Sequence, residues 1–192
     1  LCCAPFKSEE GQRYLGAMKC GANFAFANRQ LVTHWVRETL ERALGLTPRE
    51  HGTTVVYDVC HNIAKVETHV IGGEARKLCV HRKGATRAFP AGHPQVPAAY
   101  RDVGQPVLVP GDMGRYSYVL VGSPEAPDFS LASSCHGAGR RLSRKAALKA
   151  TRERNILKEL AEQGITVAAA SRATLDEEFP QAYKDVTEVV DV

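Results

Sequence analysis

His136 stands between a strand-like run and a small loop that carries two glycines, Gly137-Ala138-Gly139. Glycines let backbone N–H groups approach an anion closely, and the N-terminus of a following helix adds further donors and a positive dipole end. A neutral imidazole beside such a phosphate cradle can attack phosphorus and form a phosphoramidate. The alternative is a histidine with a purely structural role, which this segment taken alone favours.

Basic residues follow this loop closely. Eight of them share one stretch, opposed only by Glu153: Arg140, Arg141, Arg144, Lys145, Lys149, Arg152, Arg154 and Lys158. Arg140 and Arg144 are four residues apart and could share one helix face aimed at a phosphate. Such a cluster suits a polyanion, whose phosphates supply affinity without sequence choice. For the distal half, from Lys149 to Lys158, a solvated helix face is an equally good interpretation.

His61 and Asn62 form a second candidate site, directly after an apolar, strand-like run. A strand end can present an imidazole to a site, and imidazole suits divalent transition metals such as manganese and zinc. The Asn62 amide can donate and accept hydrogen bonds to a phosphate or a ribose. On these residues alone, a structural or surface role of His61 is the better interpretation.

Two turns complete the candidate sites. Pro110-Gly111-Asp112-Met113-Gly114 is a glycine-bearing turn between two predicted strands, and Ser117 after it can offer a hydroxyl to a ligand. A plain hairpin turn explains this segment equally well. The loop His81–Arg87 is compact and basic, so it could hold an RNA phosphate or be no more than a charged turn.

Helices that would position these residues can be predicted from periodicity and capping. A long helix is expected over about Ser8–Leu44, with Gly45 as its stop and a possible break near Gly21 or Asn28. One face of this helix is predicted to be buried, from the spacing of Leu31, Val32, Trp35, Val36 and Leu40. Later helices are expected over Ser143–Gln163 and Pro180–Val190.

Strand signals cluster in the middle of the chain. The predicted strands are Thr53–Val59, Lys65–Ile71, Arg76–His81, Pro106–Val109, Ser117–Val121, Phe129–Ser134 and Ile165–Ala170. The second and third flank Gly72-Gly73, which is a hairpin signal. Because strands gather in the middle with helices before and after, the order predicts an α+β fold and not a repeating βαβ one.

Composition agrees with a soluble, cytoplasmic domain. The 192 residues are 44% hydrophobic and 24% charged with a net charge of +4, and no apolar stretch approaches the roughly 20 residues of a membrane span. Six cysteines form no C-x-x-C pair, which fits a reducing compartment. Both ends, at Leu1 and Val192, have the character of cuts through a longer polypeptide.

The order and spacing of four segments favour functional roles for the candidate residues over the structural alternatives. They are HNIAKVE, HRKGATRAFP, PGDMGRYSYVL and SSCHGAGRRLSR, and together they are similar to the RtcB family of RNA ligases. APFKSEEGQRYLGAMKCGANFAFANRQ and FPQAYKDVTEVVD also resemble that family, so the resemblance covers essentially the whole chain. It implies an RtcB-like α+β fold, with central mixed or antiparallel sheets flanked by helices. Residues 1–192 would then form part of a single catalytic domain that lacks its N-terminal half and extreme C-terminus.

The resemblance also implies an activity. RtcB ligases use GTP and Mn(II) to join RNA ends that bear a 2′,3′-cyclic phosphate or 3′-phosphate to ends that bear a 5′-hydroxyl, as in tRNA splicing and RNA repair. GMP is first transferred to a histidine, which matches His136. It then passes to the RNA 3′-phosphate, from which the 5′-hydroxyl displaces it. The implied partners are RNA, such as tRNA halves, and a possible helper protein, and the implied state is a cytoplasmic monomer.

Site residues follow from the resemblance position by position. His61 matches a manganese ligand and Asn62 a nucleotide contact, while Arg140 and Arg144 fall where the family holds RNA phosphate. The positions that match guanylate contacts are Pro110, Gly111, Asp112, Met113, Ser117, Gly137, Ala138, Gly139 and Tyr183.

The chain also departs from the family pattern. The family's manganese site, which holds two ions in the intact protein, needs Asp, Cys and further His ligands from GNHF-type and DGGC-type motifs, and neither motif occurs in this sequence. The family's terminal lysine would lie beyond Val192. A metal-dependent phosphohydrolase and a non-catalytic RNA-binding module are the alternatives to a ligase.

Overall fold

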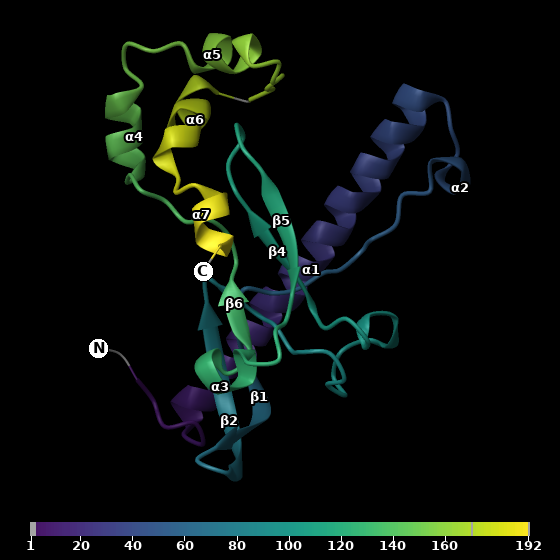
Figure 1. The fold of residues 1–192 in the computed structure, drawn as a ribbon, viewed down its shortest axis with the longest axis vertical. Coiled ribbons are helices and arrows are strands. Elements are labelled where there is room, and N and C mark those ends of the chain that lie inside the picture. Colours follow the sequence, from purple (N-terminus) through teal and green to yellow (C-terminus); the bar gives the residue numbers. More distant parts are fainter. Residues whose placement is uncertain (1–2, 170, 192) are drawn as a thin grey trace. The chain divides into compact units, whose positions relative to one another are not determined.

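A computed structural model describes residues 3–169 and 171–191 and divides into two compact units. The first unit combines Leu1–Arg87 with Glu125–Ser133, and the second combines Ala88–Pro124 with Ser134–Val192. Figure 1 labels their elements. Helices precede and follow a middle region of small two-stranded sheets, as is expected of an α+β fold. No helix among the described residues combines the length and the apolar character needed to cross a membrane.

The first unit opens with one long helix, α1 (Glu9–Leu44), as its capping signals predict. The Ser8 hydroxyl accepts a hydrogen bond from Gly11 N at 3.1 Å, and Gly45 ends the helix with a φ of 66°. The helix runs through without the break considered near Gly21 or Asn28.

The apolar stripe of α1 is not buried, so this part of the sequence prediction is wrong. Leu31, Val32, Trp35 and Val36 are all exposed among the described residues, with Trp35 at 54%. Periodicity shows which residues share a helix face, but it does not show what covers that face. An apolar stripe of this kind on a surface is typical of an interaction site.

The next elements are a short helix and a two-stranded hairpin. After α2 (Pro48–His51), β1 (Asn62–Ile71) pairs with β2 (Glu74–Lys83) across Gly72-Gly73, which confirms the predicted hairpin. Both glycines have positive φ, as a tight two-residue turn requires. Thr53–Val59, predicted as a strand, has no regular structure, because β-branched residues form strands only where a neighbouring strand pairs with them.

A buried ion pair ties this hairpin to the segment after α3 (Ala126–Ser130). Arg82 Nη1 and Nη2 each donate to a carboxylate oxygen of Glu67 at 2.8 Å, and both side chains are buried. His69 Nε2 donates to the same carboxylate at 3.0 Å. Arg82 also donates to Leu131 O and Ser133 Oγ, each at 2.8 Å. The arginine therefore holds a segment in which Leu131 has a φ of 51°, which is costly for a non-glycine residue.

Short elements replace the predicted strand Phe129–Ser134. The structure has α3 there, followed by β6 (Ser133–Cys135), which spans the boundary of the units. The remaining short elements are β3 (Ala85–Arg87) in the first unit and the 3-10 helix η1 (Ala98–Tyr100) in the second.

The second unit is built around the antiparallel pair β4 (Pro106–Pro110) and β5 (Ser117–Val121), which confirms the predicted strands. Pro110 lies opposite Ser117, so the intervening turn sits at one end of the pair. One face of this pair contributes to a buried apolar cluster: Ala88, Val107, Val109, Ala138 and Val186. The sheet therefore supports the loop that contains Ala138.

Four short helices complete this unit, where the sequence predicts two longer ones. They are α4 (Arg144–Ala150), α5 (Ile156–Glu162), α6 (Arg172–Glu177) and α7 (Val186–Val190), with the 3-10 helix η2 (Pro180–Ala182) between the last two. The predicted helix Ser143–Gln163 breaks because Asn155 starts a new one, accepting a hydrogen bond from Lys158 N at 3.1 Å. Asp185 likewise caps α7 and divides Pro180–Val190. The predicted strand Ile165–Ala170 is irregular over residues 165–169, and Ala170 lies outside the described residues.

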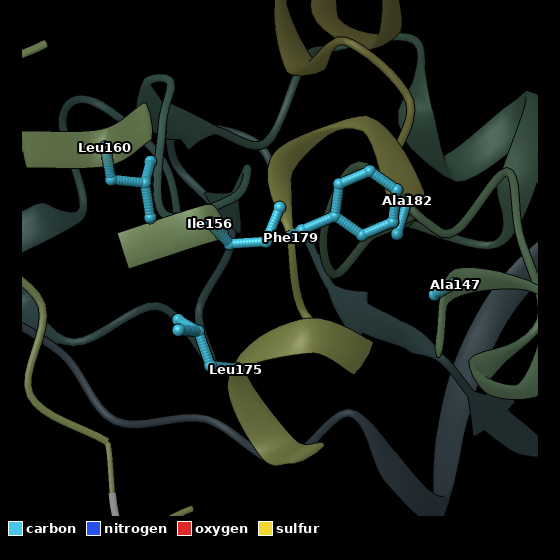
Figure 2. Close-up of a cluster of buried hydrophobic side chains, with 6 residues drawn as sticks. All are labelled: Ala147, Ile156, Leu160, Leu175, Phe179 and Ala182. Atoms are coloured by element: carbon cyan, nitrogen blue, oxygen red, sulfur yellow. The ribbon is translucent and has the colours of Figure 1, made fainter. Parts of the chain in front are cut away.

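A second apolar cluster holds these helices together. Figure 2 shows its buried side chains: Ala147, Ile156, Leu160, Leu175, Phe179 and Ala182. Phe179 is 1% exposed, so it fills the largest share of this core.

We expect Phe179→Ala to lower the free energy of unfolding of the intact protein by about 3–5 kcal/mol, because it leaves a cavity in this cluster. Equilibrium urea denaturation measures the change. The matched control is Phe129→Ala, since Phe129 is 89% exposed and its loss should change stability little. Equal effects of the two substitutions would contradict the assignment of this core.

The buried ion pair predicts a pH dependence. Burial opposes ionisation of Glu67, but hydrogen bonds from Arg82 and His69 outweigh it, so the pKa of Glu67 lies below its usual value. A lowered pKa gives stability that is present above the unfolded-state value of about 4.3 and is lost as the pH falls through the folded-state value. The stability difference between wild type and Glu67→Gln should therefore be large at neutral pH and shrink as the pH falls below about 4.3. Glu74→Gln, at an exposed ion pair, should show no such trend.

Candidate functional site

One pocket of the second unit gathers most of the residues that the sequence singles out. It has a volume of about 650 Å³ and is lined by Pro110, Gly111, Asp112, Met113, Ser117, His136, Gly137, Ala138, Gly139, Arg140, Glu178 and Tyr183. Three separate segments of the chain form its wall, and Glu178 is the one lining residue that the sequence does not point to. The volume is within the range of small-molecule and cofactor sites.

The loop after His136 is fixed at the end of strand β4. Ala138 N donates to Pro110 O at 2.9 Å, and the Ala138 methyl group is 4% exposed, within the apolar cluster of Val109 and Val186. Gly137 lies so close that a Cβ there would come within 3.3 Å of Pro110 O. These contacts hold His136 beside the turn between β4 and β5.

Gly111 allows this turn to pack against α7. A Cβ at Gly111 would collide with Tyr116 O and come within 2.9 Å of Val186 Cγ1. The Ser117 hydroxyl accepts from Gly111 N at 3.4 Å, and Asp112 Oδ1 accepts from Gly114 N at 2.9 Å. The turn is therefore held in a specific shape by its own contacts and by its packing against Val186.

Arg115 joins the turn to the segment that carries Tyr183. Its Nε lies 2.8 Å from Asp112 Oδ2, its Nη1 lies 3.0 Å from Asp185 Oδ2, and its Nη2 donates to Pro180 O at 2.9 Å. The first of these contacts is an ion pair without hydrogen-bond geometry, so the buried Asp112 Oδ2 accepts no hydrogen bond from the described residues. A hydrogen bond from Thr187 N, with the Arg115 contact, lowers the pKa of Asp185 below its usual value.

Arg140 is part of the pocket wall. Its Nη1 donates to Glu178 Oε1 at 3.0 Å and to the Tyr183 hydroxyl at 2.9 Å, and its Nη2 donates to Glu177 O. The Tyr183 hydroxyl also donates to Glu178, and the guanidinium carbon lies 4.8 Å from the centre of the Tyr183 ring. Because the protein already uses most of its donors, Arg140 positions Tyr183 and Glu178, which differs from the RNA phosphate contact that the resemblance implies for it.

Arg144 differs from Arg140 in exposure. Its side chain is 72% exposed, and its Nε lies 3.6 Å and 4.0 Å from carboxylate oxygens of Glu177 and Glu178. It lies outside the residues that line the pocket, and its weak pairing leaves it accessible to a ligand from solvent.

His61 and Asn62 belong to the first unit, whereas His136 belongs to the second. Asn62 begins β1, and its Oδ1 accepts from Gly84 N at 3.0 Å. Among residues 3–169 and 171–191, no three or more His, Cys, Asp and Glu side chains form a group that could hold a metal ion. One histidine does not make a manganese site, so the described residues do not fit this metal on their own.

The pocket suits a ligand with a planar ring and an anionic group. Gly137 N and Gly139 N form no hydrogen bond with any described residue, whereas Ala138 N is taken by Pro110 O. These two N–H groups can therefore donate to an anion beside His136. Met113 and Tyr183 offer apolar and aromatic surface in the same pocket.

Comparison with known proteins adds an independent finding. Residues 1–192 match the model of the family described as tRNA-splicing ligase RtcB. The chain is 57% identical over 192 residues to a tRNA-splicing ligase RtcB of Thermococcus kodakarensis, covering 100% of this chain and 40% of the relative. It is 56% identical over 192 residues to a tRNA-splicing ligase RtcB of Pyrococcus abyssi, covering 100% of this chain and 21% of the relative. It is 52% identical over 191 residues to one of Methanocaldococcus jannaschii, covering 100% of this chain and 20% of the relative. The chain thus spans well under half of the length of these relatives.

We expect Gly111→Ala to lower the free energy of unfolding by about 1–3 kcal/mol, since the added methyl group must displace backbone of the turn. Gly16→Ala is the matched control, because Gly16 lies within α1 with no atom near its missing Cβ. There the same substitution should raise the free energy of unfolding by up to about 1 kcal/mol through helix propensity. Urea denaturation compares the two variants, and a neutral Gly111→Ala would show that the turn does not need this close approach.

Proposed function

Because the chain belongs to the RtcB family of tRNA-splicing ligases, we propose that it carries the nucleotide-transfer residues of a GTP-dependent RNA ligase. The intact protein would join an RNA 2′,3′-cyclic phosphate or 3′-phosphate to a 5′-hydroxyl, through GMP attached to His136. The observation that supports this most directly is the pocket in which His136, a loop with unused N–H groups and the turn at Pro110–Ser117 meet.

Transfer to His136 requires a neutral imidazole nitrogen in line with the leaving group. The nitrogen forms a bond to the α-phosphorus of GTP, the bond from that phosphorus to the bridging oxygen breaks, and pyrophosphate leaves with the electron pair. GMP then moves to the RNA 3′-phosphate, and the 5′-hydroxyl displaces it to form the phosphodiester bond.

The loop and the turn have separate parts in this proposal. Gly137 N and Gly139 N would donate to the phosphate oxygens as charge develops, because both residues line the pocket with His136 and neither N–H has a partner among the described residues. The turn, with Met113 and Ser117, and the side chain of Tyr183 would hold the guanine and ribose on the other walls. Arg140 and Glu178 would position Tyr183, and Arg144 would bind RNA phosphate from the solvent side.

The intact protein would also bind manganese and RNA, with a helper protein as a further partner. We propose that His61 is one metal ligand and Asn62 a nucleotide contact, and that the remaining ligands come from residues not present in this chain. We also propose that the two units are parts of one RtcB-like catalytic domain. The tRNA-splicing names of the relatives support broken tRNA as the substrate. We also propose that the enzyme is cytoplasmic and monomeric.

The test is to incubate the intact protein with Mn(II) and GTP radiolabelled at the α-phosphate. We expect acid-labile label on wild type and none on His136→Ala, because the variant has no nucleophile. His34→Ala is the matched control, since His34 lies on α1 with a side chain 63% exposed, and it should take label like wild type. Equal label on His136→Ala would exclude His136, and release of GMP without a protein adduct would favour a phosphohydrolase.

A further inference from the structure

The basic stretch that follows His136 divides into two groups in the structure. Four of its residues pair with glutamates: Arg140, Arg144, Arg154 and Lys158. The other four are exposed, and their side chains form no ion pair or hydrogen bond with any described residue: Arg141, Lys145, Lys149 and Arg152. For part of this stretch the sequence fits a solvated helix face and a polyanion site equally well. In the structure, the presence or absence of an ion pair distinguishes two kinds of basic residue.

Arg141 lines a second, smaller cavity of the same unit. This cavity has a volume of about 340 Å³, and its wall includes Gln163, Gln181 and Arg115 but no carboxylate. Arg115 is neutralised by two aspartates, which leaves Arg141 as the unpaired cation of this wall. The backbone of Arg141 is fixed, since its N–H donates to Ala182 O at 2.8 Å.

This cavity adjoins the pocket of His136. Tyr183 lines both, and the turn that contributes Asp112 and Met113 to the pocket contributes Gly114 to the cavity. A ligand that fills both cavities would therefore contact Tyr183 and Arg141.

The chemistry of the cavity suits a phosphate diester. A guanidinium offers a planar fork of donors to phosphate oxygens, and the amides of Gln163 and Gln181 can donate or accept toward phosphate or ribose. Lys145 and Lys149 lie four residues apart on one face of α4, so they add two more unpaired charges in a row after Arg141. Glu153, which is exposed, is the acid nearest in sequence and follows Arg152 at the far end.

We propose that the Arg141 cavity binds a backbone phosphate of the RNA strand whose end lies in the His136 pocket, and that Lys145 and Lys149 bind further phosphates of that strand. This inference rests on the proposed ligase function. It assigns RNA affinity to the unpaired cations in addition to the weakly paired Arg144, whereas Arg140 and Arg154 are held by their glutamates and maintain the structure of the pocket wall and α5.

The experiment measures binding of a fluorescent oligouridylate with a 3′-phosphate to the intact protein, over a series of salt concentrations. Arg141→Ala should weaken binding roughly two- to five-fold. It should also reduce the slope of log K against log salt by about 0.7, the value for one contact to a single strand. Arg141→Ala with Lys145→Ala and Lys149→Ala should reduce that slope by about 2. Arg141→Lys should keep the slope, because the charge remains.

Lys158→Ala is the matched control. It also removes one exposed positive charge, but Lys158 lies on α5 outside the lining of the Arg141 cavity, so binding and slope should stay at wild-type values. Wild-type affinity and slope in Arg141→Ala, or an equal loss in Lys158→Ala, would overturn the proposal.

Labelling of His136 by radioactive GTP separates this inference from the function on which it rests. Label on wild type and on all these variants, together with the loss of slope at Arg141, supports both. Absence of label from wild type would refute the ligase function, whatever the RNA-binding result. Label with an unchanged slope would refute the RNA phosphate site alone.

Discussion

A backbone hydrogen bond from Ala138 N to Pro110 O fixes the loop of the site. It joins the loop that follows His136 to the end of strand β4, and the buried methyl group of Ala138 secures the same contact within an apolar cluster. The bond uses the middle N–H of the loop, while the N–H groups of Gly137 and Gly139 form no hydrogen bond with any described residue. The same hydrogen bond therefore holds Ala138 in the apolar cluster and occupies one N–H group of the loop.

The arginines beside the pocket of the second unit differ in whether their side chains are paired within the protein. Arg115 and Arg140 each contact several acceptors on the segment around Tyr183, so they act as internal supports although they lie beside a candidate anion site. Arg141 is next to Arg140 in sequence but has no side-chain partner among the described residues. Neighbouring arginines thus differ in their pairing, and only the position of the glutamates in space distinguishes them. A count of basic residues in the sequence therefore overestimates the number of unpaired cations among the described residues.

Much of the local structure was predictable, because its signals are local. Caps such as Ser8 and the hairpin at Gly72-Gly73 need only a few neighbouring residues. The break at Asn155 shows the limit, since a long periodic stretch concealed a new N-cap. The burial of Trp35 and the pairing of Thr53–Val59 depend on distant partners and were predicted wrongly. For the site, the motifs identified the lining of the pocket, but Glu178 could not be found, because nothing in its spacing marks a contact with Arg140 and Tyr183.

The central claim is that His136 carries the GMP group in this pocket. Its most direct test is to locate the attached nucleotide, by digesting the intact protein after incubation with GTP and Mn(II) and sequencing the modified peptide by mass spectrometry under non-acidic conditions. The account predicts a GMP adduct on the peptide that contains Ser133–Arg140, with the modification on His136. An adduct on a lysine, or on a histidine outside this pocket, would contradict it.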